Sequence, residues 1–331
     1  MTLTIKSVLR PVLLGSILVL ACDARRQQSE NRPVKIERLT VSNVEVTLNY
    51  FDHRLLPLDN QIKDVIKPAF VECVTVFGGL PKDSSGNVYR EFSVNMRRDP
   101  DLQMAAEADP NMIDVAMNEG MENKLVFGYL TWKLAVIHEM LHFWNAETFR
   151  YRSGREQWFN EGITEYYAFR IALKLGLIGK DEIPARLGLP LGYYLNDSGI
   201  GSLSMSEAGE GERKSGHYFL VYCGGLVAGM MLDYDIRSHS RNTKNLDDLM
   251  KAMYRAFNRA DRTYTNADVL AELNNLTGKD YREFFNRHIT GKEVIPVGQY
   301  FSLTDLYFIN NPRKFDATSQ RAAILKDMFH L

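Results

Sequence analysis

The sequence has 331 residues, enough to bury the core of one large domain or of two ordinary ones. Apolar residues make up 45% of it and charged residues 24%, a globular profile that excludes a disordered or fibrous chain. The formal net charge is −1, so no basic excess points to nucleic acid as a partner.

The first 22 residues have the pattern of a bacterial export signal. Basic residues precede an apolar run over 12–20, which is shorter than the roughly 20 residues that a membrane-spanning helix needs. The run ends in Val19-Leu20-Ala21-Cys22, which resembles a lipobox, where cleavage leaves the cysteine as the lipid-carrying N-terminus. We therefore expect a protein of the bacterial cell envelope, anchored on the periplasmic side by lipid on Cys22, with residues 23–36 as a tether. A plain export signal without lipid is the alternative.

Two further cysteines, Cys73 and Cys223, lie far apart in the sequence. In an exported protein they could form a disulfide, but two buried free thiols are equally ordinary. The sequence leaves both possibilities open.

Residues 37–124 are predicted to form a small mixed α/β lobe. Alternating apolar residues predict strands over 37–51, 88–96 and 112–117. Between the first two strands, apolar residues at helical spacing predict a helix over 60–77, which the glycines and proline that follow would end.

Residues 125–306 are predicted to form a helical lobe. An almost unbroken apolar run over 125–145 predicts a buried helix. The capping box Ser153-Gly154-Arg155-Glu156 predicts that a second helix opens there and runs to about residue 175. Residues 177–213 are predicted to be a loop, because glycines and prolines are scattered through them. Later helices are expected over 215–238, 245–259, 266–276 and 279–289.

The expected fold class is therefore α+β, with a small mixed lobe followed by a helical one. Residues 307–331 would form a C-terminal tail with a short helix over 317–329.

His138-Glu139-Met140-Leu141-His142 is an HExxH sequence within the first of the predicted helices. Four residues make just over one helical turn, so His138 and His142 project from the same face and can bind one metal ion. Glu139 lies beside the first histidine and can reach a water at that ion. Histidine pairs on apolar helices also occur in packed cores, so the motif alone does not establish a metal site.

A catalytic zinc ion needs a third protein ligand and an open fourth position. Glu161 follows His142 after 18 intervening residues, within Trp158-Phe159-Asn160-Glu161-Gly162. This spacing lets the first helix end, a loop turn and a second helix return a carboxylate to the histidines. The alternative is a solvated glutamate on an amphipathic helix. We predict that Zn²⁺ is bound by His138, His142 and Glu161.

HExxH, 18 residues and then Glu is the gluzincin arrangement. The strings His142-Phe143-Trp144-Asn145 and Trp158 to Tyr167 resemble the glycyl aminopeptidase family. The resemblance continues through 225–237 and later segments, and covers about residues 60–305. It implies a thermolysin-like gluzincin catalytic domain that acts on a peptide or protein substrate.

Relatives in this family often carry a β-domain before the catalytic part and a PDZ domain after it. The sequence has room for neither, so we expect a catalytic-domain-only member.

The resemblance also implies a tyrosine that stabilises the oxyanion, within a Tyr-x-Lys-Gly motif. The matching positions are Tyr222-Cys223-Gly224-Gly225, so Tyr222 is the candidate. Gly224 stands where the family has lysine, which puts activity and substrate preference in doubt. Packing in the core is the alternative role of Tyr222, and His217 and Tyr218 could also face the cleft.

Three further residues are candidates for supporting roles. Glu165, one turn after Glu161, could accept a proton from the outer nitrogen of a ligand histidine, although it could equally be an exposed helical glutamate. Asn145 could support the site in a similar way. Gly120-Met121-Glu122-Asn123 resembles an aminopeptidase segment whose glutamate binds the substrate amine, which makes Glu122 a candidate. Its distance from His138 in the sequence is shorter than the resemblance leads us to expect.

The predicted function is zinc-dependent peptide hydrolysis of an aminopeptidase-like kind. Glu139 would take a proton from a water at the metal and later pass it to the leaving amine, with Tyr222 stabilising the oxyanion. The alternatives are a catalytically weak or inactive lipoprotein that uses the fold as a binding scaffold, and a metal-dependent hydrolase of another substrate class.

Overall fold

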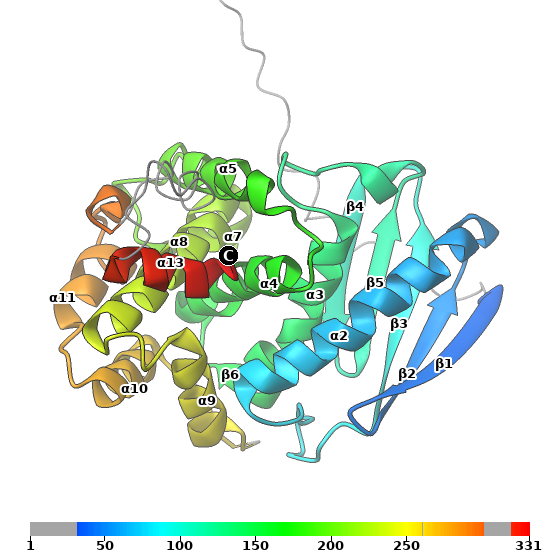
Figure 1. The fold of residues 1–331 in the computed structure, drawn as a ribbon, viewed down its shortest axis with the longest axis horizontal. Helices are drawn as coiled ribbons and strands as arrows, with labels where there is room; N and C mark the ends of the chain where they lie inside the picture. Colours follow the sequence, from blue (N-terminus) through cyan, green and yellow to red (C-terminus); the bar gives the residue numbers. More distant parts are fainter. Residues whose placement is uncertain (1–31, 260, 301–318) are drawn as a thin grey trace, which may run out of the picture.

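The computed structural model describes residues 32–259, 261–300 and 319–331. A five-stranded sheet covered by a long helix forms one side of the molecule, and helices form the other (Figure 1). The predicted α+β class, with an N-terminal sheet and a helical C-terminal part, is confirmed. The predicted signal sequence and lipidation site lie outside the described residues and stay predictions.

The sheet has the strand order β1-β2-β3-β5-β4. Its strands are β1 (Lys35–Val41), β2 (Val44–Tyr50), β3 (Glu91–Arg98), β4 (Met104–Asp109) and β5 (Met112–Met117). The three central strands β2, β3 and β5 are parallel, and β1 and β4 each run antiparallel to their neighbour. Strand β4 is an edge strand, and this edge faces the helical part (Figure 1).

Two features of the sheet differ from the prediction. The single strand predicted over 37–51 is a hairpin, because Ser42 and Asn43 both adopt positive φ and form a tight two-residue turn. Strand β4 was not predicted. Its half-buried run of small and acidic residues lacks the apolar alternation of a strand that faces a core.

Helix α2 (Asp59–Phe77) confirms the helix predicted over 60–77 and packs against both the sheet side and the helical side. Its apolar face includes Ile62, Ile66 and Phe70, all fully buried. Gly78 ends it in the left-handed conformation that glycine adopts without strain.

The helical part is built around α8 (Tyr218–His239), which packs against α4, α5, α6 and α13. The other helices are α3 (Trp132–His142), α4 (Ile163–Lys174), α5 (Ile183–Leu195), α6 (Met205–Ala208), α7 (Arg213–Gly216), α9 (Leu246–Phe257), α10 (Asn266–Thr277), α11 (Arg282–Phe284) and α13 (Gln320–Phe329). Within the described residues, α8 is long and apolar enough to cross a membrane, but most of it is buried inside the fold.

The structure corrects two predictions in this part. Helix α3 begins at Trp132 rather than residue 125, because the Thr131 hydroxyl caps it by accepting from the Leu134 N–H. The loop predicted over 177–213 contains α5, whose two prolines obscure it in the sequence. One proline lies in the first turn, where its missing N–H is harmless, and Pro190 lies in the interior.

The structure also bears on the cysteine pairing, which the sequence left open, and on the predicted C-terminal tail. Cys73 and Cys223 are both buried free thiols, so they do not pair. The helix predicted over 317–329 is α13, and it packs on α4 and α8 rather than extending as a tail.

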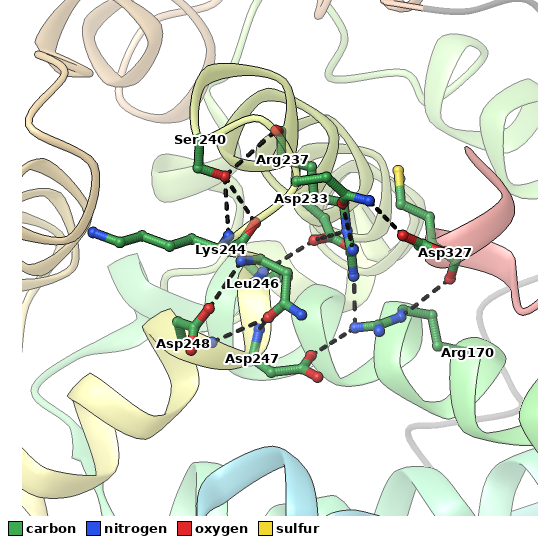
Figure 2. Close-up of polar contacts among 12 residues, drawn as sticks. Arg170, Asp233, Arg237, Ser240, Lys244, Leu246, Asp247, Asp248 and Asp327 are labelled. Atoms are coloured by element: carbon green, nitrogen blue, oxygen red, sulfur yellow. Dashed lines mark hydrogen bonds and ion pairs between the residues drawn. The ribbon is translucent and has the colours of Figure 1, made fainter. Parts of the chain in front are cut away.

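A buried ionic network joins α4, α8 and α9 (Figure 2). Asp233 of α8 is fully buried, pairs with Arg237 at 3.0 Å and accepts a hydrogen bond from the Leu246 N–H that opens α9. Arg170 of α4 binds Asp247 at 2.7 Å and donates to the carbonyl of Met328 in α13. The network therefore fixes α4, which follows the third metal-ligand candidate, against α8.

Replacing Asp233 by alanine should leave Arg170 and Arg237 buried without their shared partner. Loss of one member of a buried charge network costs about 3–5 kcal/mol, so urea unfolding should show a large drop in stability. Glu283→Ala, which removes an exposed pair with Arg287, should leave the midpoint nearly unchanged. Equal, small effects of both variants would contradict a central role for the network.

Candidate metal centre

Three ligand atoms converge between α3 and the segment that leads into α4. The Nε2 atoms of His138 and His142 are 3.0 Å apart. The Oε2 atom of Glu161 lies 3.3 Å from the first and 3.2 Å from the second. All three residues are buried, and they form a group that could hold a metal ion. The structure thus brings together the three predicted ligands.

Local sequence explains how Glu161 returns to the histidines. After α3 the chain makes a π-helical turn over 143–148, and the predicted capping box at Ser153 is present and opens a helical path that continues into α4. Gly162 then lies against Gly225 of α8, where an added Cβ would stand only 2.2 Å from the Gly225 Cα. Glycine after Glu161 is therefore required for the ligand segment to meet α8.

The spacing of the ligand atoms fits a tetrahedral ion. Zinc bonds of about 2.0–2.1 Å to nitrogen and oxygen place the ligand atoms of a tetrahedral site about 3.3 Å apart. The separations of 3.0–3.3 Å in the structure are close to this value. Two imidazoles and one carboxylate are also the donor set of a catalytic zinc site with an open position, so the residues fit the ion.

The charges around the ligands favour a cation. Burial alone would lower the pKa of His138, but Glu165, Glu161 and Glu139 outweigh it and raise this pKa to about 9. Burial likewise opposes ionisation of Glu161, but Lys214 and His142 hold the pKa of its carboxyl well below the usual range.

Glu139 also belongs to the site. It lines the same cavity as the ligands, and burial raises the pKa of its carboxyl. The backbone N–H of Ala108, in edge strand β4, donates a hydrogen bond to it. The carboxylate is therefore held between α3 and the sheet edge.

The centre opens into a cavity of about 420 Å³. One side is edge strand β4, and another is an apolar wall formed by Val126, Phe127 and Leu130. The carboxylates that line it are Glu107, Glu139, Glu147, Glu161 and Glu165. No lysine or arginine of the described chain is among its lining residues.

Tyr222 reaches the cavity, as predicted. Its ring lies parallel to that of His138 with 6.1 Å between centroids, and its hydroxyl hydrogen-bonds to Glu161. Burial, with Glu161 nearby, raises the pKa of the phenol, so it stays a donor at neutral pH. Tyr218 stacks on it at 4.0 Å and lines the cavity too.

The position where the resemblance implies lysine is closed in this chain. A Cβ on Gly224 would stand 2.9 Å from the sulfur of Met205 and 3.1 Å from the ring of Tyr194. Because those side chains fill the space, Gly224 belongs to the packing of α8, and the substitution leaves Tyr222 in the cavity.

Two further candidates, Glu165 and Asn145, have different places: the first contacts a ligand histidine, and the second holds the ligand segment from outside the cavity. The carboxylate of Glu165 lies 3.6 Å from the outer nitrogen of His138, in the place expected for a residue that orients the ring. Asn145 does not line the cavity. Its amide donates to the carbonyls of Phe159 and Asn160 and to the Thr164 hydroxyl, which ties the end of α3 to the ligand segment.

Glu122 is not brought to the cavity. It pairs with Arg98, whose side chain is almost completely buried beside it.

Sequence reasoning missed Glu107 and Glu147, which do line the cavity, and Lys214, which contacts Glu161. Glu147 stands five residues after His142, a spacing that could have marked it. No sequence pattern marked Lys214 as a site residue, because it directly follows the predicted loop over 177–213, which has no clear periodicity.

Comparison with known proteins agrees with this geometry. Residues 133–219 match the M61 glycyl aminopeptidase family. The resemblance to the glycyl aminopeptidases is confirmed over the metal-site segment. The glycyl aminopeptidase match supports a peptidase, and it spans all three ligand candidates, Glu139 and Tyr218. No curated protein sequence matches the chain.

Solved structures share the fold at low sequence identity. An aminopeptidase N family protein from Idiomarina loihiensis has a TM-score of 0.64 and 16% identity, over 83% of this chain and 49% of that one. An M1 zinc metallopeptidase from Deinococcus radiodurans has a TM-score of 0.53 and 13% identity, over 81% and 53%. Legionella pneumophila aminopeptidase A, in complex with aspartic acid, has a TM-score of 0.54 and 16% identity, over 79% and 28%. The matched part is about half or less of each of those chains.

Zinc binding should release protons at neutral pH. His138 is protonated below pH 9 in the metal-free site and must lose its proton to bind a metal, so about one proton should leave per zinc at pH 7. Apparent affinity should therefore rise with pH and level off above about pH 9. Calorimetry in two buffers of different ionisation enthalpy measures the release.

His142→Ala should abolish tight binding, whereas His239→Ala, at the exposed end of α8, should leave it unchanged. An affinity that does not change between pH 6 and pH 8 would contradict the raised pKa of His138.

Proposed function

We propose that this protein is a zinc-dependent peptidase with His138, His142 and Glu161 as metal ligands and Glu139 as the catalytic base. The main support for the proposal is the tetrahedral spacing of three buried ligand atoms, with the carboxylate of Glu139 beside them in an open cavity. A structural zinc site would be closed by four protein ligands and would have no use for Glu139.

A bound zinc ion would supply Lewis acidity, which polarises a carbonyl and makes water more acidic. The raised pKa of Glu139 suits it to take a proton from the attacking water and return it to the leaving amine. Tyr222 would donate its phenolic hydrogen to the oxyanion that develops on the scissile carbonyl. Glu165 would keep the ring of His138 oriented.

Strand β4 supplies the surface for an extended substrate. It is the terminal strand of the sheet, it lines the cavity, and its far side is not paired with another described strand. A peptide can bind such an edge through main-chain hydrogen bonds, which do not depend on its sequence. This arrangement favours a peptide over other hydrolysable substrates.

The acidic lining favours a substrate with a free amine. Glu107 and Glu147 line the cavity without belonging to the ligand set, and a carboxylate is the natural partner of an ammonium group. We therefore propose aminopeptidase-like action in which these two residues take the role that the sequence assigned to Glu122.

The alternative is a non-catalytic scaffold, which the loss of the family lysine at Gly224 favours. Its weakness is that Tyr222 still lines the cavity and Glu139 still faces the ligands. Zinc binding without cleavage of any peptide would support the scaffold.

Glu139→Gln should keep zinc affinity but lose peptide hydrolysis by a factor of about 10²–10⁴, because it removes general acid–base catalysis without changing a ligand. Initial rates on a peptide library, with zinc content measured in parallel, give both quantities. Glu119→Gln, at an exposed position, is the matched control and should behave as wild type. A Glu139→Gln enzyme as fast as wild type would rule the mechanism out.

Peptides with a free N-terminus should be cleaved and their N-acetylated forms should not. Glu147→Gln should raise KM for the free peptides about tenfold or more with little change in kcat, because it weakens the binding of a charged group. Mass spectrometry of the products distinguishes the two substrate forms. Equal cleavage of blocked and free peptides would point to an endopeptidase.

A further inference from the structure

Lys214 is a charged side chain that reaches the metal centre from outside the predicted motifs. It lies in α7, a short helix just before α8. Its Nζ donates to Oε1 of Glu161 at 2.7 Å and to Oε1 of Gln157 at 3.0 Å. It also lies 5.1 Å from the centroid of the Tyr222 ring. Three independent contacts therefore hold one ammonium group against the ligand carboxylate.

The two oxygens of Glu161 have different partners. Oε2 faces the Nε2 atoms of both histidines, while Oε1 is taken by Lys214. The lysine contact and the metal-ligand position therefore use separate atoms and can exist together. The hydrogen bond and the positive charge of Lys214 at Oε1 weaken that oxygen as a ligand, so the carboxylate favours binding an ion through Oε2 alone.

We propose that Lys214 is a positioning residue of the metal centre, which holds Glu161 as a one-oxygen ligand. The proposal rests on the metal-binding part of the proposed function. A ligand carboxylate with both oxygens available can bind an ion through one or both of them, and the second mode occupies part of the position that the reaction needs open. Lys214 disfavours that second mode and so keeps the open position for substrate.

The surroundings of Lys214 make this contact more than an ordinary surface pair. Its side chain is 28% exposed, and that of Glu161 is 10% exposed. Gln157 stands one helical turn before Glu161, so a single ammonium spans both residues and fixes the orientation of the ligand segment. Partners of ligand side chains typically change metal affinity by 10–100-fold when they are removed.

The test compares Lys214→Met and Lys214→Arg with wild type in the full chain. Lys214→Met should raise the zinc dissociation constant about 10–100-fold in chelator competition. Its cobalt-substituted form should show weaker visible absorption than wild type, because a second carboxylate oxygen raises the coordination number. Lys214→Arg keeps a charged donor and should return both readouts toward wild type. Lys292→Met, which removes an exposed lysine paired with Glu207, should change neither.

A Lys214→Met protein with wild-type zinc affinity and an unchanged cobalt spectrum would overturn the proposal. So would a Lys214→Arg protein that behaves like Lys214→Met, because the charged donor would then have no role. Urea midpoints measured without metal show whether a variant is folded; if Lys214→Met is not, the arginine variant decides by the same two readouts. Neither readout needs peptide cleavage, so a wild-type protein that binds zinc but cleaves nothing would fail the proposed function alone.

Discussion

Glu161 brings a carboxylate within 3.3 Å of two imidazole nitrogens inside a buried cavity, and the elements around it are arranged to permit this approach. Burying an ionised carboxylate is costly unless positive charge or hydrogen-bond donors accompany it. Lys214 and the Tyr222 hydroxyl meet part of that cost, and the raised pKa of His138 shows that the rest of the site attracts positive charge. A divalent cation between the three ligands would supply the positive charge that the buried carboxylate of Glu161 requires.

Helix α8 connects this site to the stability of the whole helical part. Its N-terminal turns carry Tyr218 and Tyr222 to the cavity, its middle meets Gly162 through Gly225, and its C-terminal half carries Asp233 into the ionic network. The sequence segments that resemble the family beyond the metal motif therefore have a structural explanation. They hold α4, and with it the ligand segment, at a fixed distance from α8.

Many features of the fold and the site could be predicted from the sequence, namely those that depend on residues close together in the chain. The HExxH turn, the return of Glu161 and the capping box at Ser153 depend on spacing along one or two helices, and all three are found. Strand β4 was missed because an edge strand that faces a cavity needs no apolar alternation, and α5 was missed because its prolines resemble a loop. Lys214 and Glu107 reach the site through tertiary packing, which leaves no periodic signal in a single sequence.

We propose that one zinc ion binds between His138, His142 and Glu161. Anomalous diffraction at the zinc absorption edge, from crystals grown with zinc, locates the ion directly. We expect one strong peak in the cavity, about 2.0–2.1 Å from both Nε2 atoms and from a single oxygen of Glu161. No peak at this position, or one bound by other residues with the three side chains turned away, would contradict it.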